Sequence, residues 1–401
     1  MGTGARSNNN SIGQALSTSP NSLNLVRLLL AAAVIFSHAM TLGGYRSEVV
    51  FHSTLGVVAV YGFFGISGYL IAGSAAKNNV GRYLWHRCLR IFPAYWVCLA
   101  VTAAVFGWIG WLHWGHSCVF WCYVKQPDGP VGYVVHNSWL RLNQLSIGET
   151  LRGIPLTSSW NGSLWTLFYE FLCYLLLGAL AVVGLLRHRL GIVILAAALW
   201  TVELILTAVP SFNSYFRGAP FYETALLSLV PIFLVGAAIY SGRDRVPDSG
   251  WIALGCVVAA CVGSLISVGY SIPVFTLTRS NVVAPLLVYP TLWLGAHLPW
   301  PQIGARNDYS YGIYIYAFPV AQILALWGVY RAGYLVYTAL TLIMTGAFAA
   351  ASWWLIEKHA LRLKDLAVPW RTVGTRVADD DESPGACHAE EDGRQDAEPL
   401  I

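Results

Sequence analysis

The sequence predicts an all-α integral membrane protein with about ten transmembrane helices and both termini in the cytoplasm. Composition indicates this class, because 56% of the 401 residues are hydrophobic and only 11% are charged, with a mean hydropathy of +0.56. Soluble globular domains carry roughly 25% charged residues. The apolar residues also form runs of about 20, the length at which a helix crosses a bilayer with its backbone groups satisfied internally.

The apolar runs follow one another along most of the chain, separated by short polar connections. A strongly apolar run of this length favours a helix over the shorter alternating strands of a membrane barrel. Pro285 and Pro290 should kink the eighth run. The predicted spans are 24–43, 55–74, 93–111, 163–186, 190–209, 222–240, 251–269, 280–298, 309–329 and 333–356.

The Lys and Arg residues predict the orientation, since cytoplasmic loops carry most of them. With the N-terminus inside, seventeen of the 24 fall on the inner side, which also requires an even number of spans. The chain is divided into a polar, disordered segment 1–20, a transmembrane domain 21–368 and an acidic, disordered cytoplasmic tail 369–401. No cleavable signal sequence is recognised, so the first helix is expected to be retained.

The net charge of +4 conceals an asymmetry between this tail and the rest of the chain. Residues 377–401 hold nine acidic residues and one arginine, so the preceding part is strongly cationic on its inner face. Such a face suits anionic lipid headgroups or an anionic soluble substrate.

The first span, NLVRLLLAAAVIFSHAMTLGG, contains a histidine, His38, which we take as the leading candidate site residue. An ionisable side chain at membrane depth is costly and therefore suggests function. At about 1.5 Å per residue, His38 lies roughly 20 Å beyond Asn24, in the outer half of the bilayer. A neutral packing histidine is the alternative. Arg27 near the start of the span is either functional or an interfacial cation.

The predicted inner loop KNNVGRYLWHRCLRIFP holds Arg87 and Arg90, three residues apart. This spacing would place both guanidinium groups on one helix face, where they could clamp phosphates. Ordinary topogenic cations explain them equally well. The glycines of the second span permit close helix approach, and packing alone explains most of them; they are Gly56, Gly62, Gly65, Gly68 and Gly73.

The longest connection, about 112–159, lies outside and is a candidate lid or acceptor platform. Cys118 and Cys122 could form a disulfide there, could bind zinc with His113 and His116, or could remain unpaired; no metal is assigned to the site. Glu170 enters the fourth span at a depth about level with His38, so the two could meet. For Glu203 and Glu223, protonated packing residues and substrate contacts stay open as alternatives.

Five segments in order resemble the membrane-bound acyltransferase family 3, whose members O-acylate sugars. They are His38 in its span, FFGISGYLI, Arg87-x-x-Arg90 followed by Ile91-Phe92-Pro93, SLWTLFYEF and YSYGIYIYAFPV, and the resemblance covers roughly residues 21–365. It implies a catalytic role for His38 and an acyl-donor contact for Arg87 and Arg90. One departure is Ala317, where many members have a histidine, which argues against a second catalytic histidine there.

From these observations we predict an O-acyltransferase of the plasma membrane. Acyl-CoA, with acetyl as the expected acyl group, is a co-substrate, no cofactor is bound, and the acceptor is an extracytoplasmic sugar or glycolipid. His38 would act as general base and Glu170 would orient its imidazole; an acyl-histidine intermediate stays open. Nucleic acid is not an expected partner, and the sequence is silent on oligomeric state.

The competing function is a proton-coupled transporter or flippase using His38, Glu170 and Glu203 as a relay. A structural or sensory membrane protein is a third alternative. A transporter would be expected to show paired repeats with interrupted helices, and no internal repeat is visible in the sequence.

Overall fold

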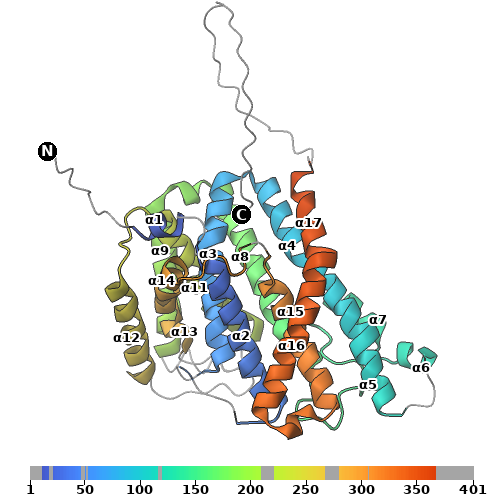
Figure 1. The fold of residues 1–401 in the computed structure, drawn as a ribbon. Coiled ribbons are helices and arrows are strands. Elements are labelled where there is room, and N and C mark those ends of the chain that lie inside the picture. The colour runs from blue at the N-terminus through green and yellow to red at the C-terminus, as the bar shows by residue number, and fades with distance from the viewer. Residues whose placement is uncertain are drawn as a thin grey trace, which may run out of the picture. The chain divides into compact units, whose positions relative to one another are not determined.

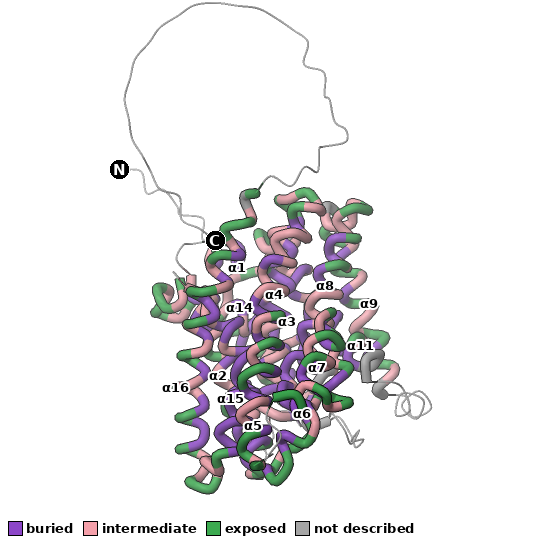
Figure 2. Tube along the Cα trace, turned by 90° about the vertical axis from the view of Figure 1, so that its right-hand side faces the viewer, coloured by how far each residue is buried: buried purple, intermediate pink, exposed green. Residues whose placement is uncertain are grey.

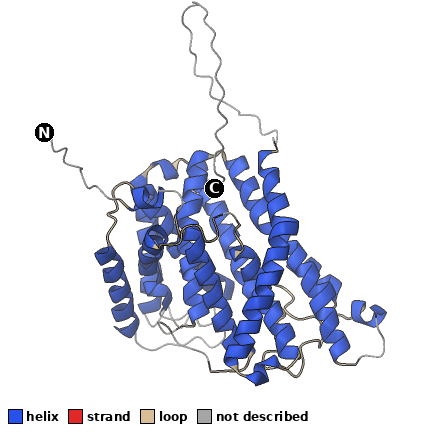
Figure 3. Ribbon diagram, in the orientation of Figure 1, coloured by secondary structure: helices blue, strands red, loops and turns tan. Residues whose placement is uncertain are grey.

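Helices account for the regular structure of the part of the chain that the computed structural model describes (Figure 3). The described residues are 11–17, 21–46, 50, 53–115, 120–208, 221–266, 280–305 and 307–366, and they contain no strand. Residues 1–366 form one compact unit. Residues 367–401, which hold the predicted acidic tail, lie outside the described part. The prediction of an all-α membrane protein is confirmed.

Most of the predicted spans coincide with a helix of the structure, and Figure 1 shows how these helices are arranged. Six helices are long and apolar enough to cross a bilayer by length and composition, and shorter apolar helices accompany them. The main helices are α2 (Leu23–Leu42), α3 (Leu55–Lys77), α4 (Val80–Val101), α5 (Gly107–His113), α8 (Trp165–Val182), α9 (Arg189–Ala208), α11 (Phe221–Ser241), α12 (Gly250–Ile266), α13 (Ser280–Val283), α14 (Val288–His297), α15 (Ser310–Leu326), α16 (Tyr334–Ser352) and α17 (Lys358–Arg362).

Short elements join or extend these helices. Two π-helical turns continue α4 into α5 and α16 into α17, and a 3-10 turn containing Pro285 separates α13 from α14, where a kink was predicted. The short elements are α1 (Ile12–Ser17), α6 (Phe120–Val124), α7 (Pro130–Asn137), η1 (Thr102–Phe106), η2 (Gly162–Leu164), η3 (Leu185–Arg187), η4 (Ala284–Leu287), η5 (Val329–Ala332), η6 (Trp353–Glu357) and η7 (Leu363–Asp365).

The third span differs from the prediction, because the expected inner loop is helical. Helix α4 begins at Val80, where the Asn79 side chain caps it by accepting a hydrogen bond from the Arg82 N–H at 2.8 Å. Proline cannot donate a backbone hydrogen bond, yet α4 continues through Pro93. Arg87 and Arg90 therefore lie inside a membrane-crossing helix, about 10 and 15 Å from its first residue.

Helix α15 lies in the core of the bundle, and all of its residues except Ile313 are buried (Figure 2). It packs against α2 and α16, while α3 packs against α2 and α11. Helices α1 and α17 lie at the same end of the bundle (Figure 1). We call this the α1 end; the sequence predicts that it faces the cytoplasm.

The described part of the long connection between α5 and α8 packs against α15. Gln322 of α15 donates from Nε2 to the backbone carbonyl of Ser159 at 2.6 Å, and Asn161 donates to the carbonyl of Ile315 at 2.8 Å. Trp160 between them is fully buried. The last residues of this connection are therefore packed among the helices beside α15.

Candidate active site

A carboxylate at the start of α15 binds two arginines from different helices. Asp308 Oδ2 accepts from Arg27 Nη1 of α2 and from Arg90 Nη2 of α4, each at 2.5 Å. Its other oxygen accepts from the Ser310 backbone N–H at 3.2 Å and hydroxyl at 2.5 Å. Buried charges are tolerated when they are paired and hydrogen-bonded. Asp308 thus links α2, α4 and α15.

A second carboxylate extends this group of charges. Glu357 in η6 is 2% exposed, and its Oε2 lies 3.6 Å from Arg90 Nη1. Its Oε1 accepts from the Ser352 hydroxyl at 2.9 Å. Arg90 is therefore held between two acids. We call Arg27, Arg90, Asp308 and Glu357 the ion cluster.

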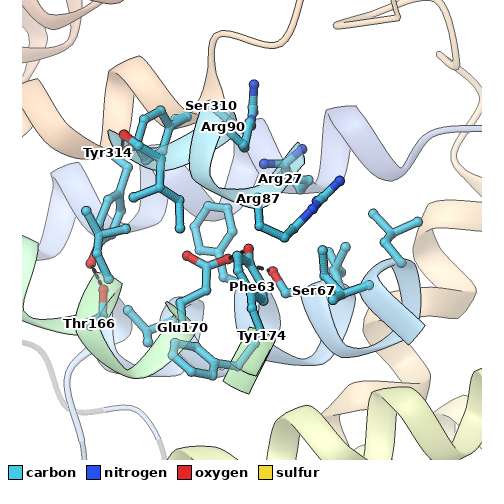
Figure 4. A pocket seen from close by; sticks show the side chains of 18 residues that line it. Arg27, Phe63, Ser67, Arg87, Arg90, Thr166, Glu170, Tyr174, Ser310 and Tyr314 are labelled. Atoms are coloured by element: carbon cyan, nitrogen blue, oxygen red, sulfur yellow. Dashed lines mark hydrogen bonds between the residues drawn. The ribbon is translucent and has the colours of Figure 1, made fainter. Parts of the chain in front are cut away.

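A cavity extends from the ion cluster into the bundle between α2, α3, α4, α8 and α15 (Figure 4). The volume of the cavity that the centre of a water molecule can reach is about 120 Å³. Because one water needs about 10–15 Å³ of such space, roughly ten waters or a slender chain could enter. The lining is mixed, with three arginines (Arg27, Arg87 and Arg90), one carboxylate (Glu170), hydroxyl groups and apolar side chains.

Arg87 differs from the other two arginines of the cavity. Within the described residues it forms no ion pair, and its buried Nε has no hydrogen-bond partner. Its guanidinium carbon lies 6.0 Å from the centre of the Tyr174 ring. Arg87 therefore has hydrogen-bonding capacity that its surroundings leave unused.

Glu170 reaches the cavity from α8. Its Oε1 accepts from the Ser67 hydroxyl of α3 at 3.0 Å and from the Tyr174 hydroxyl one turn along α8 at 2.5 Å (Figure 4). Among the described residues no hydrogen bond joins Glu170 to His38, so the expected pair is not formed in this structure. The physical reason is that equal depth does not fix the direction in which a helix presents a side chain.

His38 lies on α2 roughly 16 Å from Arg27 and is not among the residues that line the cavity. Its ring packs edge to face on Phe318 of α15, with ring centres 5.2 Å apart and an interplanar angle of 68°. Tyr314, one turn before Phe318, does line the cavity. His38 thus lies about one helical turn beyond the far end of the cavity.

The far end of the cavity is closed by aromatic and hydroxyl groups. Tyr314 is hydrogen-bonded to the Thr166 hydroxyl and donates to the Ser163 carbonyl at 2.6 Å. Phe63 packs against the Tyr314 ring at 6.1 Å between ring centres. Phe318 occupies the next turn and also contacts Gly162, whose missing side chain leaves room for that ring. Tyr314, which lines the cavity, and Phe318, which contacts the imidazole, are therefore neighbours one turn apart on α15 between the two.

Sequence reasoning singled out Arg87 and Arg90 together but missed their different surroundings. The sequence leaves Arg27 as either functional or interfacial, and it does not indicate that Asp308 and Glu357 pair with arginines. The available signal was a set of opposite charges within apolar segments, because membrane helices seldom carry such residues without partners.

The outer connection includes a disulfide-bonded cysteine, Cys122. The candidate partner Cys118 and the candidate zinc ligand His116 lie outside the described residues. No group of three or more His, Cys, Asp or Glu residues suited to a metal ion occurs within the described part of the chain.

Comparison with known proteins assigns the chain to a family. The family model for the acyltransferase domain of family 3 matches residues 21–357. The chain belongs to this family. The chain is also 30% identical over 350 residues to an O-acetyl transferase of Shigella phage Sf6, covering 85% of this chain and 96% of that protein.

A second relative is Nodulation protein 10 of Rhizobium leguminosarum bv. viciae, 28% identical over 372 residues, which are 88% of this chain and 96% of the relative. No solved structure matches the chain. The family and its relatives identify this multi-pass membrane protein as an O-acyltransferase, so a transporter without acyl-transfer chemistry is no longer the competing function.

Proposed function

We propose that this acyltransferase moves an acyl group from cytoplasmic acyl-CoA to a hydroxyl of an extracytoplasmic sugar or glycolipid, with His38 as general base. The observation that carries the proposal is the order of groups along the bundle. Arginines line a cavity near the α1 end, and a histidine lies beyond its far end. A donor with an anionic head and a slender arm matches the first site.

The reaction needs one group that accepts a proton and later returns it. The acceptor oxygen would attack the thioester carbonyl carbon while His38 takes the hydroxyl proton. When the tetrahedral intermediate collapses, the C–S bond breaks and the imidazolium gives its proton to the departing sulfur. The acyl-histidine route would instead place the acyl group on the imidazole first.

The geometry suggests a different role for Glu170 from the one predicted. Its carboxylate lies in the cavity with hydrogen bonds to Ser67 and Tyr174, so we place it along the path of the donor arm rather than behind the imidazole. Passage of the thioester to His38 would require Tyr314 and Phe318 to swing aside. Their side chains are the barrier between cavity and histidine.

Acetyl is the acyl group that we propose, because one relative is named an O-acetyl transferase. The plasma membrane is the proposed location, since it gives one protein access to a cytoplasmic thioester and an external glycan.

The proposal is tested by acyl transfer with purified protein in lipid nanodiscs. Labelled acetyl-CoA and surface glycans from cells lacking the protein are the substrates, and mass spectrometry of the glycan product names the acyl group. His38→Ala should abolish transfer while CoA binding persists. The matched control is His297→Ala, since His297 lies at the end of α14 and pairs with Asp248 at 3.2 Å. Transfer by His38→Ala at the wild-type rate would exclude a catalytic role for this histidine.

A further inference from the structure

The three arginines of the cavity are not equivalent. Arg27 and Arg90 share the same oxygen of Asp308, and Arg90 also lies beside Glu357. Arg87 has neither acid as a partner, and its Nε is buried without a hydrogen bond. Because Arg87 and Arg90 are three residues apart on one helix, this difference comes from the neighbouring helices and not from α4 itself.

The formal charges lead to the same distinction. The ion cluster contains two guanidinium groups and two carboxylates, so its formal charge is zero. Arg87 is the remaining cation among the described residues that line the cavity. The cavity carboxylate Glu170 accepts from the neutral hydroxyls of Ser67 and Tyr174 and keeps its negative charge, but among the described residues no ion pair joins it to Arg87. An entering anion therefore meets one guanidinium whose hydrogen bonds are unused.

We propose that Asp308 is a positioning residue that commits Arg27 and Arg90 to the protein, and that Arg87 alone takes the anionic group of the acyl donor. The inference rests on the proposed function, because it assumes a polyanionic donor. It replaces the symmetric clamp of Arg87 and Arg90 with one donor contact and one structural ion pair. The anion concerned is a phosphate of the donor, which a guanidinium can bind with two parallel hydrogen bonds.

Asp308 also sets the positions of the helices that carry the chemistry. It joins α2, which carries His38, to α4, which carries Arg87, and it lies directly before α15, which carries Phe318. One carboxylate thus fixes the distance between the donor contact and the proposed base. Loss of its charge should leave Arg27 without an acid, leave Arg90 with Glu357 alone, and loosen this arrangement.

The test compares two substitutions of the same type on the same helix, Arg87→Met and Arg90→Met. Binding of CoA itself is measured by calorimetry with full-length protein in nanodiscs, so the result does not depend on the acceptor. Arg87→Met should weaken CoA binding about tenfold to a hundredfold, the effect of a lost charge-assisted hydrogen bond. Arg90→Met should change it less than about threefold and lower the melting temperature. Equal weakening in both variants would overturn the inference.

Substitution of Asp308 tests whether this residue positions the arginines or only stabilises the fold, because only a positioning residue is expected to change the affinity for CoA. Asp308→Asn should tighten CoA binding about three- to tenfold, because the ion cluster then has two guanidinium groups and one carboxylate, Glu357, while the acyl-transfer rate falls. Asp308→Glu should restore both values towards wild type. Unchanged or weaker CoA binding in Asp308→Asn would contradict the proposed role.

Two controls separate this inference from the proposed function. If wild-type protein does not bind CoA, the proposed donor is wrong. If it binds CoA but Arg87→Met and Arg90→Met lose affinity equally, the proposed donor survives and the positioning role of Asp308 is refuted. Should Arg90→Met fail to accumulate, Arg87→Lys and Arg90→Lys provide the same comparison, with the loss of affinity expected only at position 87.

Discussion

Substitution of Gly68 by alanine should separate α3 from α11 and damage the cavity wall. A Cβ atom at this position would lie 1.9 Å from the Phe233 backbone carbonyl oxygen, and ordinary contact begins near 3.4 Å. The helices would have to move apart by about 1.5 Å, because neither backbone can yield locally. Gly236 on α11 is almost as close to α3, with its Cβ position 2.2 Å from the Gly65 carbonyl oxygen. The contact is therefore tight from both sides.

The expected loss of stability is at the upper end of the range for overpacked cores, about 3 kcal/mol. Thermal unfolding in nanodiscs should show a melting temperature lower by about 5 °C or more. Ser67, adjacent to Gly68, binds Glu170 in the cavity, so CoA binding should weaken as well. Gly346→Ala is the matched control, since nothing lies within 4 Å of its Cβ position. Equal melting temperatures for the two variants would refute the close-packing argument.

Three further substitutions address the cavity, the contact of Asn161 with α15, and the outer connection. Tyr174→Phe removes a 2.5 Å hydrogen bond to Glu170 and should lower unfolding stability by about 1.5–3 kcal/mol, measured by thermal unfolding; an unchanged melting curve would show that this bond contributes nothing. Asn161→Ala leaves the buried Ile315 carbonyl with one hydrogen-bond donor fewer and should lower the free energy of unfolding by about 1–3 kcal/mol. Asn161→Asp also lacks the amide donor, so a much smaller loss of stability in that variant would argue against the role of the donor. Cys122→Ser breaks a disulfide and should lower the melting temperature. A reductant should then have no further effect on the variant, and a further decrease of the same size would rule out that explanation.

The positions of most helices follow from hydropathy alone. The predicted spans 24–43 and 190–209 correspond to Leu23–Leu42 and Arg189–Ala208, because a helix that faces lipid must be apolar over the thickness of the bilayer. The third span was predicted too short for the same reason. A hydropathy window counts Arg87 and Arg90 as costs, and it cannot register that Asp308 and Glu357 lie beside Arg90 in the fold.

The candidate site shows where this reasoning stops. Ionisable side chains in apolar spans and the resemblance to the family indicated the site residues, which are His38, Glu170, Arg87 and Arg90. The roles assigned to them stay predictions. Their arrangement required the tertiary structure: Glu170 is directed at Ser67 and Tyr174, and the imidazole is directed at Phe318. Rise per residue gives a depth along the helix axis, but the direction of a side chain around that axis depends on which helices are neighbours.

Local composition and helix geometry are enough to predict the membrane class, the helical architecture and the residue types available for chemistry. Which charges pair depends on the three-dimensional fold. Asp308 is separated from Arg90 by 218 positions along the chain, and the strength of their interaction depends on distance in space and on burial. That pairing distinguishes Arg90 from Arg87, which pairs with neither acid and which we propose as the contact for the acyl donor.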